Sequence, residues 1–321
     1  MPPPIDSTEA PRQAAANEAP SSPPSKAPGR ELLPIVTPPP PPPPPRTKRK
    51  PLPKWLQLRI KASTFLSRSR ELSTGNVIVL PFNKIAKLDV PEGEIAAMRF
   101  VRANTTIPIP EILEIHDAQE DGTAHIVMSR VPGDDLEAVM DNMTDAEVKS
   151  VVKELARYLQ QMRRLEGDGV RTPVPPIGGV SGTRGFDSRL GSSRWGPFAT
   201  IADFHKHLRF GEPLDYWDHE ADVVAVHGKP EGTYAVKFTH ADIAPRNVRV
   251  KGGRITGIID WEFAGWYPEY WEYTRMFYPG ERPYLRRWFN AIEEETGIEK
   301  YKTERKAEEA IWARAGPFGY D

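Results

Sequence analysis

The 321-residue sequence contains no cysteine. This absence excludes disulfide bonds, thiolate zinc sites and a cysteine nucleophile. It also fits a reducing compartment, in which disulfides are not used to stabilise a fold. We therefore expect a cytoplasmic protein.

Long apolar runs and an excess of charge of either sign are also missing. The 43 Lys and Arg residues nearly cancel the 44 Asp and Glu residues, leaving a formal net charge of -1 at pH 7. No global field attracts nucleic acid or an anionic membrane, so we expect neither as a partner. No segment approaches the roughly 20 apolar residues of a membrane helix. The first residues, Met1-Pro-Pro-Pro, lack the pattern of a signal peptide, so we expect a soluble protein.

Proline, by contrast, is abundant at the start of the chain. Residues 1–52 are rich in Pro, Ala and Ser, and residues 38–45 are all proline. This composition favours extended polyproline II and cannot form a core, so we predict a disordered Pro-rich arm. Such an arm could bind a polyproline-binding partner. The basic residues 46–50 could be a nuclear-import signal, flank such a ligand, or be solvated charge without a function.

A globular pattern begins near Trp55 and continues to about residue 131. Residues 92–102 place apolar side chains at helical spacing. Short apolar segments bounded by turn residues predict four strands, at residues 77–80, 85–87, 112–116 and 123–131. The order strand, strand, helix, strand, strand predicts a small antiparallel sheet with one helix on it, over residues 53–131.

The remaining residues, 132–321, are predicted to be mostly helical. Thr144-Asp-Ala-Glu147 has the form of a capping box, and the amphipathic run behind it extends to Leu165. Residues 171–197 are rich in Gly, Pro and Ser without periodicity, so we expect an irregular insertion there. Another helix is expected at residues 199–208. The fold class is therefore α+β.

The strongest indication of chemistry lies in residues 238–262. This segment reads as a loop, a strand, a Gly-Gly turn and an apolar strand that ends in an acid. Phosphoryl transfer needs a base beside the acceptor hydroxyl and oxygen ligands for the metal ion on the phosphates. Asp242 meets the first requirement as the catalytic base. Asn247 and Asp260 meet the second as ligands of Mg2+.

The same segment resembles a known family. Its catalytic loop at residues 240–247 and its metal-binding segment at 255–262 are similar to those of the aminoglycoside phosphotransferase and choline kinase group. The matching motifs are His240-Ala-Asp242, Asn247 and Ile259-Asp-Trp-Glu262. The stretch from Asp260 to Tyr273 is similar to the fungal subfamily. The resemblance covers residues 75–275 and implies a two-lobed protein kinase-like fold, with a small antiparallel β N-lobe and a mostly helical C-lobe.

The resemblance also implies a nucleotide site. In related kinases a strand lysine holds the α- and β-phosphates, and a helix glutamate holds that lysine. These positions match Lys87 and Glu94, whereas the competing Lys84 lies on the opposite face of the strand. Taken alone, the pair also fits a solvated strand-end lysine and an ordinary first-turn acid. The adenine is expected to lie against the segment that joins the lobes, at Met128 and Arg130.

Several residues of the motif depart from the family pattern or leave a choice open. Residues 73–75, Ser-Thr-Gly, hold one glycine where repeated glycines would let backbone amides approach phosphates. Ala241 replaces the glycine of most relatives, which is tolerable if this position does not need a positive φ. His240 is expected to hydrogen-bond loop backbone rather than move protons. Arg246 is assigned no chemistry, and Glu262 fits either contact with substrate cations or a turn cap.

Three tryptophans close together, Trp261, Trp266 and Trp271, allow two interpretations. They could form a cage for a cationic ligand. Core packing is the simpler expectation, because large aromatic side chains contribute most of their free energy through burial.

Together these features predict an enzyme that uses ATP and Mg2+ to phosphorylate a hydroxyl of a small molecule. A protein acceptor is disfavoured, because the segment after Asp260 lacks both the glycine and the Ala-Pro-Glu end of the protein-kinase form. Aminoglycosides name the family and need not be the acceptor. The alternative is a pseudokinase-type binding or scaffold protein with the same fold, which recruits partners through its Pro-rich arm.

Overall fold

The computed structural model describes residues 51–59, 73–74, 76–117, 123–165, 176–191, 193–278, 282–296 and 300–315. All of these described residues belong to one compact unit. The arm predicted over residues 1–52 lies outside the described residues, except for its last two. No helix in the described ranges combines the length and the apolar character that crossing a bilayer requires.

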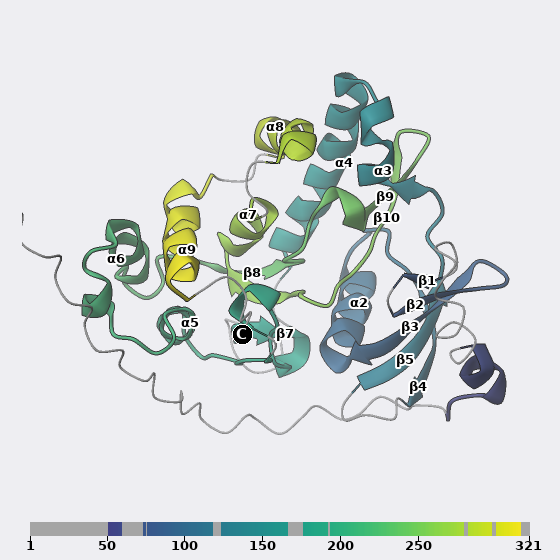
Figure 1. Ribbon diagram of the computed structural model, residues 1–321, viewed down its shortest axis with the longest axis horizontal. Coiled ribbons are helices and arrows are strands. Elements are labelled where there is room, and N and C mark those ends of the chain that lie inside the picture. Colours follow the sequence, from purple (N-terminus) through teal and green to yellow (C-terminus); the bar gives the residue numbers. More distant parts are fainter. Residues whose placement is uncertain are drawn as a thin grey trace, which may run out of the picture. The chain divides into compact units, whose positions relative to one another are not determined.

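A five-stranded antiparallel sheet, in the order β1-β2-β3-β5-β4, occupies the N-terminal part of the described chain (Figure 1). Its strands are β1 (Ser73–Thr74), β2 (Val77–Leu80), β3 (Lys84–Pro91), β4 (Ile112–Asp117) and β5 (Thr123–Ser129). The four predicted strands are confirmed. Strand β3 is longer than expected, because a register shift between Lys87 and Val90 allows it to keep pairing with β5.

Helix α2 (Glu92–Asn104) follows β3 directly and lies beside this sheet in Figure 1. Its apolar face is buried in the main core, as the spacing of Ile95, Met98 and Val101 predicts. Residues 54–59 are helical and bury Leu56 in a separate small cluster with Ile78 and other residues of the sheet. Complete burial of one leucine contributes about 2 kcal/mol.

The fold begins slightly before residue 53. Leu52 packs against the cluster around Leu56, and the carbonyl oxygen of Pro51 lies 3.3 Å from His116 Nδ1. These two residues, which we assigned to the arm, therefore contact the sheet. Their side-chain and backbone contacts show that the N-terminal region of the fold includes them.

Helices predominate in the rest of the chain. They are α3 (Leu136–Val139), α4 (Asp145–Arg163), α5 (Ile201–Leu208), α6 (Ala221–His227), α7 (Trp271–Met276), α8 (Arg286–Glu295) and α9 (Lys302–Ala315). The predicted capping box of α4 is confirmed. Thr144 Oγ1 accepts from the Glu147 N–H at 3.3 Å, and the Glu147 carboxylate accepts from the Thr144 N–H at 2.7 Å.

Two small sheets hold the segments that bear the motif. One has the order β10-β9-β6, and the other has the order β7-β11-β8. Their strands are β6 (Asp134–Asp135), β7 (Gly178–Gly179), β8 (Val236–Thr239), β9 (Val248–Lys251), β10 (Arg254–Ile258) and β11 (Gly265–Pro268). The turn between β9 and β10 has a positive φ at both Gly252 and Gly253, which explains the glycine pair.

The insertion predicted at residues 171–197 is irregular over its described residues. It contains the short strand β7 and the 3-10 turns Val180–Gly182 and Ser188–Leu190, while residues 171–175 and 192 lie outside the description. Trp261, Trp266 and Trp271 are all buried in the main core. Core packing, rather than a cation cage, is confirmed for these three side chains.

Candidate active site

The clearest feature of the site is a buried lysine that contacts two carboxylates. Lys87 Nζ on β3 lies 2.7 Å from Glu94 Oε1 on α2 and 2.8 Å from Asp260 Oδ1, two residues after β10. Burial disfavours the ammonium form, but the two carboxylates outweigh it and raise the pKa of Lys87 well above its usual value. The lysine is therefore positively charged at every physiological pH.

The position of Lys87 on its strand explains this choice of lysine. Residues 84 and 87 are an odd number of positions apart, so their side chains point to opposite faces of β3. Lys87 faces α2, whose first turn supplies Glu94, whereas Lys84 pairs across the strand end with Leu80. The structure therefore brings together the lysine and glutamate that the resemblance indicated.

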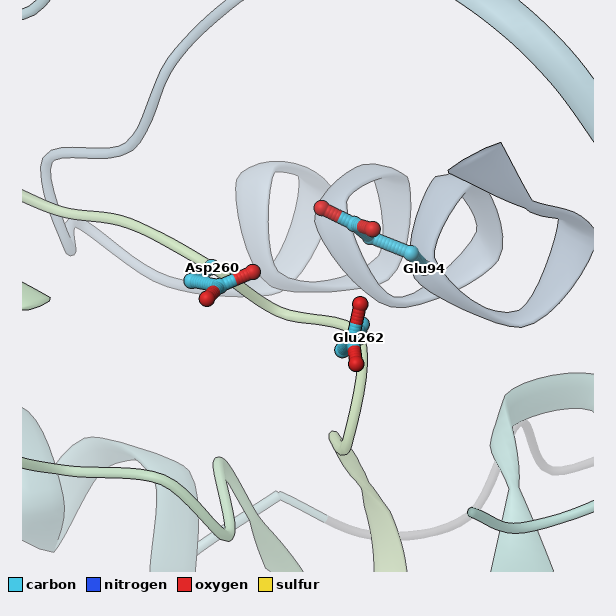
Figure 2. A group of neighbouring side chains, drawn as sticks. All are labelled: Glu94, Asp260 and Glu262. Carbon is cyan, nitrogen blue, oxygen red and sulfur yellow. The ribbon is translucent and has the colours of Figure 1, made fainter. Parts of the chain in front are cut away.

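Three carboxylates meet beside this lysine. Figure 2 shows Glu94 on helix α2 and Asp260 and Glu262 on the segment after β10, with their carboxylates directed toward a common region. One oxygen from each lies within 4.8 Å of the others. Burial and the Asp260 carboxylate raise the pKa of Glu262. Clustered acids of this kind are stabilised by a cation.

An unpartnered oxygen in this cluster suits a hard metal ion. Glu94 Oε2 is buried and has no hydrogen-bond partner among the described residues. Mg2+ takes oxygen ligands, usually one or two carboxylates together with phosphate oxygens and water. The acids beside Lys87 therefore offer oxygen donors of the kind that Mg2+ takes, and among them Asp260 is the ligand that the sequence motif indicated.

Asp242 and Asn247 lie together in the loop that follows β8. Asn247 Nδ2 donates to both the carbonyl oxygen and Oδ2 of Asp242, each at 2.8 Å. The Asn247 carbonyl oxygen accepts from the Ile259 N–H at 3.0 Å, which ties the loop to the residue before Asp260. Asp242 and Asn247 are thus bonded directly, and Asp260 is connected to them through its neighbour Ile259. The Asn247 side-chain oxygen has no hydrogen bond to either residue.

Buried groups fix the backbone of this loop. His240 Nδ1 accepts from the Asp242 N–H at 3.2 Å, and Nε2 lies 3.1 Å from the Ile259 carbonyl oxygen. The predicted contact of the His240 ring with loop backbone is therefore present. The Glu272 carboxylate on α7 accepts from the N–H groups of His240 and Ala241 at 2.8 and 3.1 Å. Burial raises the pKa of Glu272 to about 7, although these two donors oppose the shift.

Ala241 does not satisfy the condition under which we expected it to be tolerated without cost. Its φ is 62°, in the left-handed region where a Cβ costs roughly 1–2 kcal/mol. The bond from its N–H to Glu272 and a bond from Arg275 Nε to its carbonyl oxygen hold this conformation. Asp260 also has a positive φ, 67°, so both strained residues flank the predicted chemistry.

A buried network of charges connects Asp242 to the C-terminal helix. Arg275 Nη1 lies 3.1 Å from Asp187 Oδ1, and its Nη2 lies 3.3 Å from Asp242 Oδ1. Asp187 also binds Arg189, whose Nη1 reaches Glu308 on α9 at 3.0 Å. Because each charge has a partner, the insertion and α9 are held rigidly to the loop.

Arg246 lies on the exposed side of the same carboxylate. Its Nη2 is 2.8 Å from both oxygens of Asp242, four residues earlier. We assigned Arg246 no chemistry from the sequence, yet the structure places it on the predicted base.

The backbone of the segment that joins the lobes already takes part in hydrogen bonds within the protein. Met128 is buried in β5, and the Arg130 N–H donates to the Asn83 carbonyl oxygen at 2.8 Å. The Ser129 N–H donates to the Glu111 carbonyl oxygen at 2.9 Å. These two N–H groups are therefore already used.

Of the predicted single-glycine loop at residues 73–75, the structure describes only strand β1, since Gly75 lies outside the described residues.

Sequence reasoning missed three participants, Glu272, Arg275 and Arg246. The first two stand three residues apart on α7, within or just beyond the stretch that resembles the fungal subfamily. Their role depends on how α7 packs under the loop, which no local pattern encodes. Arg246 offered one signal, its spacing of four residues from Asp242.

The architecture and this site together define a class of protein. A small antiparallel sheet with one helix, followed by a mostly helical region, is the two-lobed protein kinase-like fold. Residues 65–310 match the Phosphotransferase enzyme family, so the chain belongs to that family.

Individual relatives are more distant. Clavilactone A biosynthesis cluster protein Y of Ampulloclitocybe clavipes is 26% identical over 201 residues, covering 54% of this chain and 49% of its own length. Hygromycin-B 4-O-kinase of Escherichia coli is 24% identical over 202 residues, covering 60% of this chain and 52% of its own length. The chain thus spans about half the length of these two curated relatives. A crystal structure of aminoglycoside phosphotransferase APH(4)-Ia is 19% identical with a TM-score of 0.48, covering 80% of this chain and 88% of that one.

Proposed function

We propose that this chain is an ATP- and Mg2+-dependent phosphotransferase that moves the γ-phosphoryl group to a hydroxyl of a small molecule. One observation carries the proposal. Lys87 Nζ contacts Glu94 at 2.7 Å and Asp260 at 2.8 Å, although the two acids lie on separate elements. This is the arrangement with which kinases hold nucleotide phosphates beside their metal ion. Family membership and the hydroxyl specificity in the name of the 4-O-kinase relative support the same reaction.

Each motif residue has a role in this proposal. Lys87 binds the α- and β-phosphates, and Glu94 keeps the ammonium group in place. Asp242 orients the acceptor hydroxyl and takes its proton as the bond to the γ-phosphorus forms. Asp260 and the side-chain oxygen of Asn247 are the proposed ligands of Mg2+, which would offset the negative charge of the phosphates. The fixed loop contributes mainly by positioning, because phosphoryl transfer needs little covalent help.

The adenine would lie against residues 128–131, near Met128 and Arg130 as the resemblance implies. Because the Ser129 and Arg130 N–H groups already have acceptors, carbonyl groups of this segment are the better candidates for contact with the base. We keep the boundary between the lobes at residues 131 and 132. The cytoplasmic location and a polyproline-binding partner of the arm rest on composition alone.

A pseudokinase-type scaffold is the second candidate. One observation favours it, namely that Arg246 covers both oxygens of the Asp242 carboxylate. A scaffold, however, has no need to keep a base, two metal ligands and a phosphate-binding lysine together. The shared geometry of Lys87, Asp242, Asn247 and Asp260 therefore supports the enzyme.

Nucleotide binding is tested by thermal unfolding with ATP in the presence and absence of Mg2+. We expect ATP to raise the Tm only with Mg2+, since a ligand at 100 times its Kd stabilises the fold by about 2.7 kcal/mol. Asp260→Asn should lose the Mg2+-dependent part of the shift. Asp141→Asn, an exposed acid outside the site, should keep it. Equal Tm values with and without Mg2+ in the wild type would contradict the proposal.

A further inference from the structure

The predicted base is held between one fixed and one movable arginine. Arg275 is buried and bound to Asp187 and to the Ala241 carbonyl oxygen, so it stays in place. The Arg246 side chain is 51% exposed and contacts Asp242 through Nη2 alone. Exposed ion pairs are typically worth less than about 1 kcal/mol. Because its own guanidinium group is solvated, Arg246 can leave Asp242 more easily than the buried Arg275 can.

Arg246 also lines a pocket of about 260 Å3 beside the loop. The pocket is bounded by α3, the loop, the end of α7 and the start of α8. Its walls include the aromatic side chains of Tyr284, Trp288 and Phe289. A partly aromatic site, lined by the arginine that contacts the predicted base, suits a small organic molecule.

The charges of the pocket select the kind of molecule. Arg246 and Arg282 are its two basic residues, and Glu137 is its one acidic residue. The rest of the lining is apolar or aromatic. A polycationic ligand would meet two guanidinium groups, whereas a carboxylate or phosphate could bind Arg246 in the planar geometry that arginine favours. The lining therefore favours an anion with an apolar body.

We infer that this pocket binds the acceptor, and that the acceptor is a hydroxyl compound carrying a carboxylate or phosphate on an apolar body. The inference rests on the proposed phosphotransferase function and specifies its substrate class. The anion binds Arg246 and draws it from Asp242, which leaves a carboxylate oxygen free for the acceptor hydroxyl. The hydroxyl oxygen then bonds to the γ-phosphorus, the bond to ADP breaks, and the proton passes to Asp242. Acceptor binding and exposure of the base are thereby coupled.

The experiment measures binding without nucleotide. A panel of hydroxyaryl and hydroxyalkyl carboxylates is titrated calorimetrically, each beside its primary amide and the corresponding amine, with a second arm of phosphate monoesters. We expect the best carboxylates or phosphates to bind about 10- to 100-fold tighter than their neutral partners, because hydrogen bonds to charged groups are the stronger ones. The arm that binds tighter identifies the anion. Amines should bind weakest.

Arg246→Gln should reduce the preference for the anion to near equality with the amide. Arg286→Gln is the matched control, an exposed arginine on α8 outside the pocket lining, and it should keep the wild-type preference. Amines that bind as tightly as the acids, a panel in which no anion exceeds its amide, or an unchanged preference in Arg246→Gln would overturn the inference. Because nucleotide is absent, these outcomes are independent of the Mg2+-ATP test, whose failure would instead contradict phosphotransfer.

Discussion

The two halves of the candidate site hold their charges in different ways. We propose one half for the nucleotide and the other for the acceptor, and call them the nucleotide side and the acceptor side. On the nucleotide side, the Lys87 and Glu94 side chains are 8% and 2% exposed and belong to neighbouring elements. On the acceptor side, Asp242 is 14% exposed, and its partner Arg246 is 51% exposed. A buried pair is costly to break, because the remaining charge is left unpaired, whereas a pair with one exposed partner opens more readily.

This difference indicates that the two sides have different roles. The nucleotide side is preformed, with Lys87 and Glu94 already at hydrogen-bond distance. On the acceptor side, the buried groups His240, Glu272 and Arg275 fix the loop, and one exposed side chain, Arg246, contacts Asp242. Such an arrangement keeps the base in position while its exposed partner responds to the acceptor.

Breaking the buried pair is expected to have the largest effect. Lys87→Met leaves the Glu94 carboxylate buried beside Asp260 and Glu262, and we expect it to lower the free energy of unfolding by about 3–5 kcal/mol. The double variant Lys87→Met/Glu94→Leu should lose less free energy of unfolding than the two single variants lose in sum, because it removes both charges. Urea unfolding of Lys87→Met, Glu94→Leu and the double variant measures these effects.

Lys84→Met is the control for this cycle, since Lys84 lies on the same strand but faces away from Glu94. It should change the free energy of unfolding by no more than about 0.5 kcal/mol, as surface substitutions usually do. Additive losses for Lys87 and Glu94, or a large loss for Lys84→Met, would show that the nucleotide side is not the preformed half.

The role of the buried His240 in the acceptor side is tested by the pH dependence of the free energy of unfolding. Burial lowers the pKa of His240 to about 4 from its ordinary value of 6.5. As the pH falls, His240 is protonated in the unfolded chain before it is protonated in the folded protein. The contribution of the neutral His240 ring to the free energy of unfolding is therefore complete above pH 6.5 and is lost as the pH falls toward 4. This loss should reach about 3 kcal/mol in the wild type.

His240→Gln should reduce this acid slope of the free energy of unfolding by the share of His240, as measured by urea denaturation at a series of pH values. The control His219→Gln changes an exposed histidine and should keep the wild-type slope. If the slope of His240→Gln equals that of the wild type, the imidazole is not the buried anchor of the loop.

Much of this architecture is encoded locally in the sequence. The capping box of Thr144, the helical spacing of Ile95, Met98 and Val101, and the glycine pair of the β9–β10 turn each specify their element. The alternation of side chains along β3 also separates Lys87 from Lys84. Periodicity and turn chemistry act within a few residues, which is why these features could be predicted.

Other parts of the site depend on packing between distant segments. Glu272 and Arg275 reach the loop only because α7 lies under it, and Asp187 joins them from the irregular insertion. The positive φ of Ala241 follows from these tertiary bonds and not from alanine itself. A single sequence gives no measure of such contacts, so the charged network around Asp242 could not be predicted.

We propose above that Asp242 is the base of a small-molecule phosphotransferase. This proposal is tested most directly by incubating the protein with Mg2+, ATP labelled in the γ-phosphate, and a mixture of small metabolites from a cell extract, and counting label in non-nucleotide products. We predict transfer by the wild type and a loss of about 10²-fold or more in Asp242→Asn. Mg2+-ATP binding by this variant should remain close to that of the wild type. Equal transfer by the two proteins would contradict the role of Asp242 as the base, and no transfer by the wild type would contradict phosphotransfer itself.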